Sequence, residues 1–372
     1  MVGLLISPTA TAQDKPLGLG YADPLGALII QAAINEGYFS DEGLTVTPIA
    51  TDNWADFLEK KTVVGGVLDY QALLLAHKGA SLVFTGGLYS GFLELVGREP
   101  IPGKTILATE DPLSGPAVAA AKYFESRGLD SSRDIKWLKV AKDDLVKAVL
   151  SGQASALTRW QLAQPDPQEP WGSLVYAPKA HSHGHGHSSG SGSGSGHGPG
   201  SSHGASDHGA SEKPRATPPP DQTNKDGYQI IYLAKAHLPQ APAGAKGANP
   251  HAGHTAEHHF FQAFPVLASD FINADKAKAT AITRALIRGA RWVGENKDQA
   301  AQLGVAQKIW PGSKAELVGE IGRYMWMPGV SQAREHLKTY LHQGIKRGAL
   351  PANVDEKILF EKVFVQLLPD FR

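Results

Sequence analysis

The chain has 372 residues, enough for two domains that each bury a core of their own. Lys and Arg number 36, as do Asp and Glu, and this balance points away from a nucleic-acid partner. Cysteine is absent, which excludes disulfides, thiolate catalysis and cysteine zinc sites and fits an extracytoplasmic protein. No apolar run approaches the roughly 20 residues of a membrane span.

The N-terminus has features of a secretory signal. A short apolar run, Val2–Ile6, is followed by small residues that end in Ala10-Thr11-Ala12, an A-x-A cleavage pattern. The basic segment that normally precedes the apolar run is missing, which a misplaced start codon would explain. We expect residues 1–13 to be a signal-peptide remnant and the protein to be secreted to the periplasm; an untidy terminus is the alternative.

Strands and helices alternate through the first hundred residues. Strands are predicted at Leu17–Tyr21, Gly43–Ile49, Val63–Val67, Ser81–Thr85 and Leu93–Gly97, and helices at Leu25–Glu36, Asn53–Lys61 and Tyr70–Lys78. This alternation predicts an α/β fold with mostly parallel sheets flanked by helices.

One βα unit carries a candidate anion site. Lys104–Thr109 is a predicted strand, Glu110–Gly115 a loop, and Pro116–Arg127 a helix with one apolar face. Ser114 is placed to cap this helix, and Pro116 suits its first turn. Free N–H groups at a helix start bind small anions, so Ser114 and Gly115 are candidate ligand contacts. An ordinary βα unit, with Ser114 serving only as a cap, is the alternative.

The remaining pattern adds strands, helices and two polar insertions. Strands are predicted at Ile135–Val140, Ala154–Trp160, Tyr228–Ala234 and Phe264–Ala268, and helices at Lys142–Leu150, Ala274–Glu295, Lys314–Trp326, Ser331–Arg347 and Val354–Leu367. Residues 177–227 contain no large apolar side chain, which predicts disorder. A second polar segment spans 239–259.

Eleven of the 15 histidines lie in these insertions. Neutral imidazoles bind zinc, nickel and copper, and several from one segment can complete a site. We expect a divalent transition metal, with zinc favoured over nickel or copper. The candidate ligands alternate with small residues in the first insertion and are closely spaced in the second: His181, His183, His185, His187, His251, His254, His258 and His259. A disordered linker without function, or an engineered insertion, is the alternative for the first insertion.

Several short motifs resemble the periplasmic substrate-binding proteins of ABC importers, in the group that serves nitrate, sulfonates, taurine and thiamine precursors. The matching stretches follow the family's order and cover most of the chain outside the insertions: Gly18–Tyr21, Glu36–Phe39, Asp41–Val46, Gly66–Tyr70, His77–Ala80, Pro102–Ile106, Leu150–Ala156, Ala290–Val293 and Gln299–Ala301. Two features depart from the family pattern, namely Ser155 in place of an aspartate and the histidine-bearing insertions.

The resemblance implies a two-lobed periplasmic-binding-protein fold of type II. Residues 14–102 and 264–372 would form lobe 1, and residues 103–263 would form lobe 2, which contains both insertions. Ligands of such proteins lie between the lobes, where strands end and helices begin. This places Asp23, Asn53, Trp54, Ser114, Gly115, Arg159 and Trp160 at the cleft.

Each of these side chains also has a structural interpretation. Asp23 would bind a cation or amine, or cap the helix beginning at Pro24. Arg159 would hold an anion bidentately, or lie solvated on the surface. Trp54 and Trp160 would wall the pocket, or belong to the core.

The resemblance implies an ABC importer's solute-binding protein, which delivers its cargo to a membrane permease and is expected to be a monomer. We expect the cargo to be a divalent transition metal, free or chelated, or a small organic anion. In the second case the histidines would only buffer metal. A synthase of the thiamine pyrimidine precursor and a periplasmic metal chaperone are the alternatives. No catalytic motif supports an enzyme.

Overall fold

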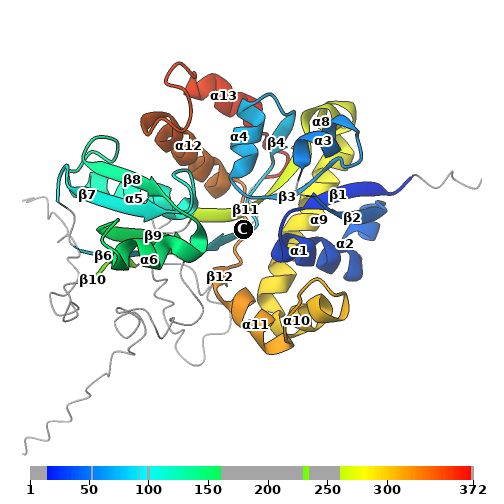
Figure 1. Cartoon of the computed structure of the whole chain (residues 1–372). Coiled ribbons are helices and arrows are strands. Elements are labelled where there is room, and N and C mark those ends of the chain that lie inside the picture. The colour runs from blue at the N-terminus through cyan, green and yellow to red at the C-terminus, as the bar shows by residue number, and fades with distance from the viewer. Residues whose placement is uncertain are drawn as a thin grey trace, which may run out of the picture.

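Among the residues that the structure describes, the chain forms two β-sheets, each covered by helices (Figure 1). The computed structural model describes residues 15–51, 53–91, 93–98, 101–160, 229–233 and 260–369. Within that part of the chain, no helix has the length and apolar character needed to cross a membrane. The α/β class expected from the sequence is confirmed.

The first sheet has seven strands in the order β12-β5-β11-β3-β1-β2, with β4 also paired to β11. Its strands are β1 (Leu17–Tyr21), β2 (Val46–Ala50), β3 (Gly65–Leu68), β4 (Leu82–Phe84), β5 (Tyr89–Gly91), β11 (Phe260–Ala268) and β12 (Tyr324–Met325). Strands β1, β2 and β3 are parallel, whereas β11 runs antiparallel to β3, β4 and β5. We call this sheet and its helices the first lobe.

Glycines allow β1 and β3 to approach closely. Gly20 pairs with Gly66, and a Cβ atom built on Gly66 would lie 1.9 Å from the Gly20 carbonyl oxygen. A Cβ on Gly20 would lie 2.6 Å from the Trp54 ring, which covers that face of β1. The glycine-rich strands are therefore a packing requirement of the first sheet.

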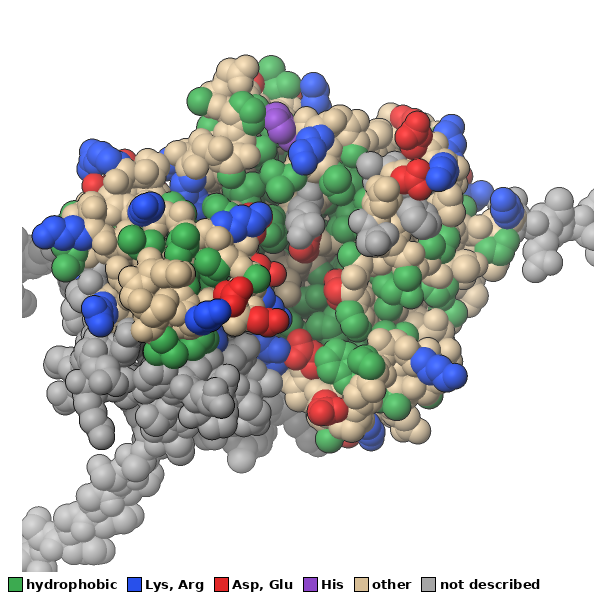
Figure 2. Space-filling view, in the orientation of Figure 1, with side chains coloured by type: hydrophobic (Ala, Val, Ile, Leu, Met, Phe, Trp, Pro, Cys, Tyr) green, Lys and Arg blue, Asp and Glu red, His purple; other side chains and the backbone are tan. Residues whose placement is uncertain are grey.

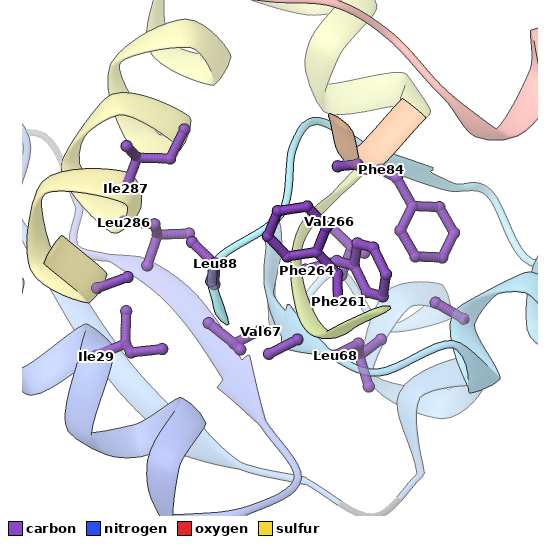
Figure 3. Packing of buried hydrophobic residues seen from close by; sticks show 14 of the residues in the cluster. Ile29, Val67, Leu68, Phe84, Leu88, Phe261, Phe264, Val266, Leu286 and Ile287 are labelled. Atoms are coloured by element: carbon purple, nitrogen blue, oxygen red, sulfur yellow. The ribbon is translucent and has the colours of Figure 1, made fainter. Parts of the chain in front are cut away.

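A large apolar core lies between this sheet and its helices. The helices are α1 (Pro24–Asn35), α2 (Tyr38–Asp41), α3 (Trp54–Glu59), α4 (Gln71–His77), α8 (Ser269–Ala274), α9 (Lys276–Glu295), α10 (Lys297–Ala306), α11 (Lys314–Gly322), α12 (Ser331–Lys346) and α13 (Glu356–Val363). Figure 3 shows Ile29 of α1 and Leu286 of α9 on one side of this core and Phe264 of β11 on the other. The long contact between α1 and α9 is made by buried residues of both helices.

The second sheet has five strands in the order β10-β6-β9-β7-β8. They are β6 (Leu93–Gly97), β7 (Thr105–Thr109), β8 (Ile135–Lys139), β9 (Ala156–Trp160) and β10 (Gln229–Leu233). Helix α5 (Gly115–Ser126), the 3-10 helix η1 (Lys142–Asp144) and helix α6 (Leu145–Leu150) accompany them. Two small apolar clusters, one with Phe124 of α5 and one with Leu145 of α6, form the core of this second lobe.

The lobes meet where α5 packs on α12 and on β11. Glu125 of α5 accepts hydrogen bonds from Lys346 Nζ at 2.6 Å and from Gln343 Nε2 at 3.2 Å. The Arg347 guanidinium lies 4.5 Å from the centre of the Trp137 ring of β8, and burial lowers the pKa of Arg347 to about 10. Polar and aromatic contacts therefore join the two lobes on this side.

Three details of the chain differ from the sequence expectations. Leu93–Gly97 belongs to the second sheet, because β6 pairs with β9 and β10 rather than with any first-lobe strand. We therefore propose that the chain crosses into the second lobe before Leu93 and returns before Phe260. Helix α11 ends at Gly322 and is followed by β12, and α10 is a helix that the apolar pattern did not indicate.

Candidate functional site

A cleft separates the lobes on the face shown in Figure 2, with acidic side chains on both of its walls. In the first lobe, the carboxyl ends of β1, β2 and β3 lead into the starts of α1, α3 and α4. In the second, the carboxyl end of β7 leads into α5. The cleft thus has the position expected for ligands in open α/β sheets.

The strand register brings two aspartates and a tyrosine into one row at this edge of the first sheet. Tyr21 of β1 pairs with Val67 of β3, and Asp23 and Asp69 each follow two residues later, so both come at the carboxyl edge of this sheet. Leu68 pairs with Phe264 of β11, and Tyr89 of β5 pairs with Ala263, the next residue back along β11. Asp69 and Tyr89 therefore flank the same position of β11.

Asp23 caps helix α1. Its Oδ1 accepts a hydrogen bond from the Gly26 N–H at 2.8 Å, and Pro24 occupies the first turn. Burial raises the pKa of this carboxyl, and the backbone hydrogen bonds offset only part of that effect. Capping, one of the two interpretations of Asp23, is confirmed, and the carboxyl still lies partly exposed at the cleft edge.

Aromatic rings line the first lobe beside this row. The ring centre of Tyr89 lies 5.0 Å from that of Tyr324 and 4.8 Å from that of Trp326. Tyr89 is buried, whereas Tyr324 and Trp326 are partly exposed. Burial is the main cause of the raised pKa of Tyr89, and the charges of Asp23 and Asp69 raise it further.

The β2–α3 loop and the first residue of α3 each carry a buried polar atom without a hydrogen-bond partner. Asn53, one of the candidates, caps α3 by accepting from the Asp56 N–H at 3.2 Å. Trp54 is 4% exposed and belongs to the core, yet its Nε1 has no partner. Thr51 is 6% exposed, and its Oγ1 also lacks one. Thr51 follows Ala50, which pairs with Tyr21, so it lies next to Ala22 at the cleft edge.

Ser114 serves its own helix. Its Oγ accepts from the Ala117 N–H at 3.3 Å, and its carbonyl accepts from the Val118 N–H at 2.9 Å. Pro116 has no N–H to offer. Among the first four residues of α5, only Gly115 still has an N–H group for a ligand. Most of the N–H groups expected to bind an anion near Ser114 and Gly115 are therefore used within the helix or absent.

The β7–α5 loop instead presents carboxylates. Asp111 accepts from the Leu113 N–H at 2.7 Å and pairs with Lys139 Nζ at 3.2 Å. Burial raises the pKa of the Tyr70 hydroxyl in the first lobe, and the charges of Asp111, Asp69 and Glu110 raise it further. Carboxylates from both lobes therefore act on the same tyrosine at the start of α4.

Arg159 is part of a buried ion pair rather than a surface cation. It pairs with Glu94 across β9 and β6, and its Nε lies 2.7 Å from Glu94 Oε2. The Arg159 side chain is 11% exposed and that of Glu94 is fully buried. This carboxylate neutralises the charge proposed to hold an anion. Trp160 ends β9 at the same edge, but its side chain is outside the described part of the structure.

The histidines proposed as metal ligands fall outside the described residues, in 161–228 and 234–259. Among the residues that the structure does describe, no group of three or more His, Asp or Glu side chains is placed to hold a metal ion. Any metal site built from described side chains alone would therefore lack the usual donor set.

Two further hollows lie on the first lobe, away from the cleft. One, of about 700 Å³, lies between α3, α4 and α8 and is lined by apolar side chains such as Leu58, Leu75 and Phe271. It also touches Val64 and Ser81, which precede β3 and β4. The other, of about 620 Å³, lies beside α4 and α13. The first opens at the amino ends of β3 and β4, where α/β folds do not usually bind ligands.

Solved structures with the same fold are periplasmic binding proteins. The aliphatic sulphonate-binding protein SsuA of Escherichia coli is 12% identical, with a TM-score of 0.52 over 92% of this chain and 97% of that one. The nitrate-binding protein NrtA of Synechocystis is 11% identical, with a TM-score of 0.51 over 94% and 86%. A Candida albicans protein described as having the generic periplasmic binding protein fold is 9% identical, with a TM-score of 0.50 over 95% and 96%.

The chain has the periplasmic-binding-protein fold. This confirms the two-lobed architecture that the sequence motifs indicated. No protein-family model and no curated protein matches the sequence. At identities this low the likeness concerns the fold, so the ligand has to be argued from this chain's own side chains.

Sequence reasoning missed Asp69, Tyr89 and Glu94 as residues of this region. Asp69 lies within the Gly66–Tyr70 motif, so a signal for it was present. Tyr89 and Glu94 carry no motif, and their positions follow from pairings with Ala263 and Arg159 far along the chain.

Proposed function

We propose that this protein is an extracytoplasmic solute-binding protein of an ABC importer, which holds a small ligand between its lobes. The observation that supports this most is the arrangement at the cleft, where β1–β3 of one lobe and β7 of the other lead into helix starts. The charges of Asp69 in the first lobe and of Asp111 and Glu110 in the second raise the pKa of Tyr70, which supports a ligand that both edges contact. Binding would favour a closed state that a membrane permease recognises.

The histidine-bearing segments would bind a divalent transition metal, zinc before nickel or copper. Support comes from the alternating histidines at 181–187 and the four at 251–259. Because the described residues lack a three-donor group, these histidines would supply the metal ligands themselves. We infer a role in metal uptake or buffering beside the cleft.

Small-angle scattering of the full chain tests the binding function. Candidate solutes from the sulfonate, nitrate, amine and metal classes are added one at a time, and the radius of gyration is measured. A solute of the importer closes the cleft and reduces the radius. A radius that stays constant with every class, and with a periplasmic extract, would contradict a hinged binding protein.

Calorimetry with Zn²⁺ tests the metal function separately. The chain with His181, His183, His185 and His187 changed to Ala is compared with the chain in which His251, His254, His258 and His259 are changed. Each set is expected to remove part of the zinc stoichiometry. Unchanged stoichiometry and affinity in both variants would show that the histidines do not hold the metal.

A further inference from the structure

The charge at the cleft has a consequence for the class of ligand. We propose that the interlobe cleft takes an organic cation, an ammonium group held by Asp23 and Asp69 beside the rings of Tyr89, Tyr324 and Trp326. This inference rests on the proposed function and narrows its ligand. It departs from the oxyanions that the sequence motifs suggested.

The first-lobe wall offers two carboxylates in one row. Asp23 and Asp69 follow the neighbouring strands β1 and β3 at one edge of the sheet, and the charges of both act on Tyr89 of β5. Burial makes a carboxylate costly unless a positive charge or hydrogen bonds accompany it. The α1 backbone hydrogen bonds only partly compensate Asp23, so a ligand ammonium would stabilise its charged form.

Among the described residues, the second-lobe wall has few uncompensated positive charges or free N–H groups that could bind an anion. The Arg159 guanidinium is paired with a fully buried Glu94 at 2.7 Å. At the start of α5, Ser114 engages the N–H groups of Ala117 and Val118, Pro116 has none, and only the Gly115 N–H remains. Lys139 pairs with Asp111 at 3.2 Å, so this cation is also matched by a carboxylate.

The aromatic rings suit a cation as well. Tyr324 and Trp326 are partly exposed, and their ring centres lie 6.5 Å apart at an angle of 86°. A ligand cation within about 6 Å of such a ring is attracted by the negative face of its π system. Glu320, which accepts from the Tyr324 hydroxyl at 2.8 Å, is matched by Arg323 at 2.6 Å and adds no net charge.

An independent sign of a ligand is the unpartnered Thr51. Its Oγ1 is buried without a hydrogen bond, although buried hydroxyl groups nearly always have one. Thr51 follows β2 and Asp23 follows β1, the neighbouring parallel strand, so both residues come at the carboxyl edge of the sheet. A polar group of the ligand beside its ammonium would satisfy this hydroxyl.

The donor set favours an organic cation over a metal ion. Transition metals in proteins take three or four protein donors. The row contains two carboxylates, and no larger group of metal-ligating side chains exists among the described residues. Carboxylates with aromatic neighbours are instead the usual surroundings of an ammonium group.

Calorimetry on the full chain decides the ligand class. Choline and putrescine are the ammonium probes, methanesulfonate and nitrate the anion probes, and zinc chloride the metal probe. The variants are Asp69→Asn and Asp23→Asn, since asparagine keeps a cap such as that of α1 while removing the charge. Asp355→Asn is the matched control, because Asp355 caps α13 by accepting from the Ile358 N–H at 2.9 Å.

At least one ammonium probe is expected to bind at least tenfold more tightly than either anion. Each cleft variant should weaken that binding about tenfold or more, as expected when a charge-assisted hydrogen bond loses its charge, and Asp355→Asn should not. Tighter binding of methanesulfonate or nitrate, binding of zinc alone in the cleft, or no ammonium binding would overturn the inference. If an anion both binds and reduces the radius of gyration, the proposed function stands and only the cation assignment fails.

Discussion

The two lobes contain the same βα unit with different chemistry at its helix start. Strand β1 and helix α1 have five and 12 residues, as do strand β7 and helix α5. Both helices have a side-chain cap and a proline in the first turn. The cap is a carboxylate, Asp23, in the first unit and a hydroxyl, Ser114, in the second.

The comparison shows that capping and charge are separate properties of a helix start. Either side chain satisfies backbone N–H groups, but only Asp23 adds a negative charge to the cleft. The strands differ too, because β1 has glycines where β7 has Ile106 and Ala108. One unit therefore depends on close backbone approach and the other on side-chain packing.

The largest expected effect is on the buried ion pair of the second lobe. Arg159→Met would leave the carboxylate of Glu94 buried without its guanidinium, and the free energy of unfolding should fall by about 3–5 kcal/mol. Urea denaturation of the variant measures this.

Two controls sharpen that result. Replacing both partners, Glu94→Leu with Arg159→Met, should recover much of the loss because no charge remains buried. Lys60→Met removes an exposed pair with Asp56, 66% and 40% exposed, and should change stability by less than about 1 kcal/mol. An equal loss in all three variants would contradict a special role for burial.

The next largest expected effect is the loss of stability when the close glycine contact between β1 and β3 is disturbed. Gly66→Ala would place its Cβ 1.9 Å from the Gly20 carbonyl oxygen, and separating β1 from β3 should cost about 1–3 kcal/mol. The midpoint of thermal unfolding reports it. Gly319→Ala in α11 is the control, since nothing lies within 4 Å of its Cβ, and there a gain of about 0.5–1 kcal/mol is expected.

The caps test the comparison directly. Ser114→Ala removes the acceptor of the Ala117 N–H and should cost about 1–2 kcal/mol in unfolding free energy. Asp23→Asn keeps an acceptor for the Gly26 N–H and should change stability by only a few tenths of a kcal/mol. If Asp23→Asn were the more destabilising, the Asp23 charge would be contributing to stability rather than to ligand binding.

The smallest expected effect is the acid sensitivity of the contact between the lobes. Hydrogen bonds from Lys346, Ser131 and Gln343 outweigh the burial of Glu125 and hold its pKa below the ordinary 4.5. A lowered folded-state pKa gives stability that is present above 4.5 and lost as the pH falls through the folded value.

Urea midpoints at pH 7 and pH 3.5 measure this loss. The midpoint difference should be smaller in Glu125→Gln, which cannot titrate. An identical difference in both proteins would place the acid sensitivity elsewhere.

Local pattern predicted much of this architecture. The expected helices Leu25–Glu36 and Pro116–Arg127 match α1 and α5 within one residue, because apolar spacing and proline mark them clearly. The β12 strand was predicted as helix, since a strand of two residues takes its conformation from pairing with β5. A short sequence motif does not show which distant strand its residues will pair with.

The candidate site was less predictable than the fold. Ser114 and Asp23 were found because caps are local, and Asp69 lay inside a matching motif. The pairing of Arg159 with Glu94 depends on the register of strands far apart in sequence. The sequence therefore did not show that a carboxylate neutralises the Arg159 charge. Charge balance in a cleft depends on such partners, and single residues do not reveal it.

Strand β10 has a consequence for how this gene can change. Among the described strands it lies at the edge of the second sheet and pairs with β6, with Gln229 opposite Gly97 and Leu233 opposite Glu94. The two histidine-bearing stretches join the fold on either side of these five residues. If these stretches bind metal as proposed, insertions and deletions in either of them would change metal binding without changing the register of β10 on β6.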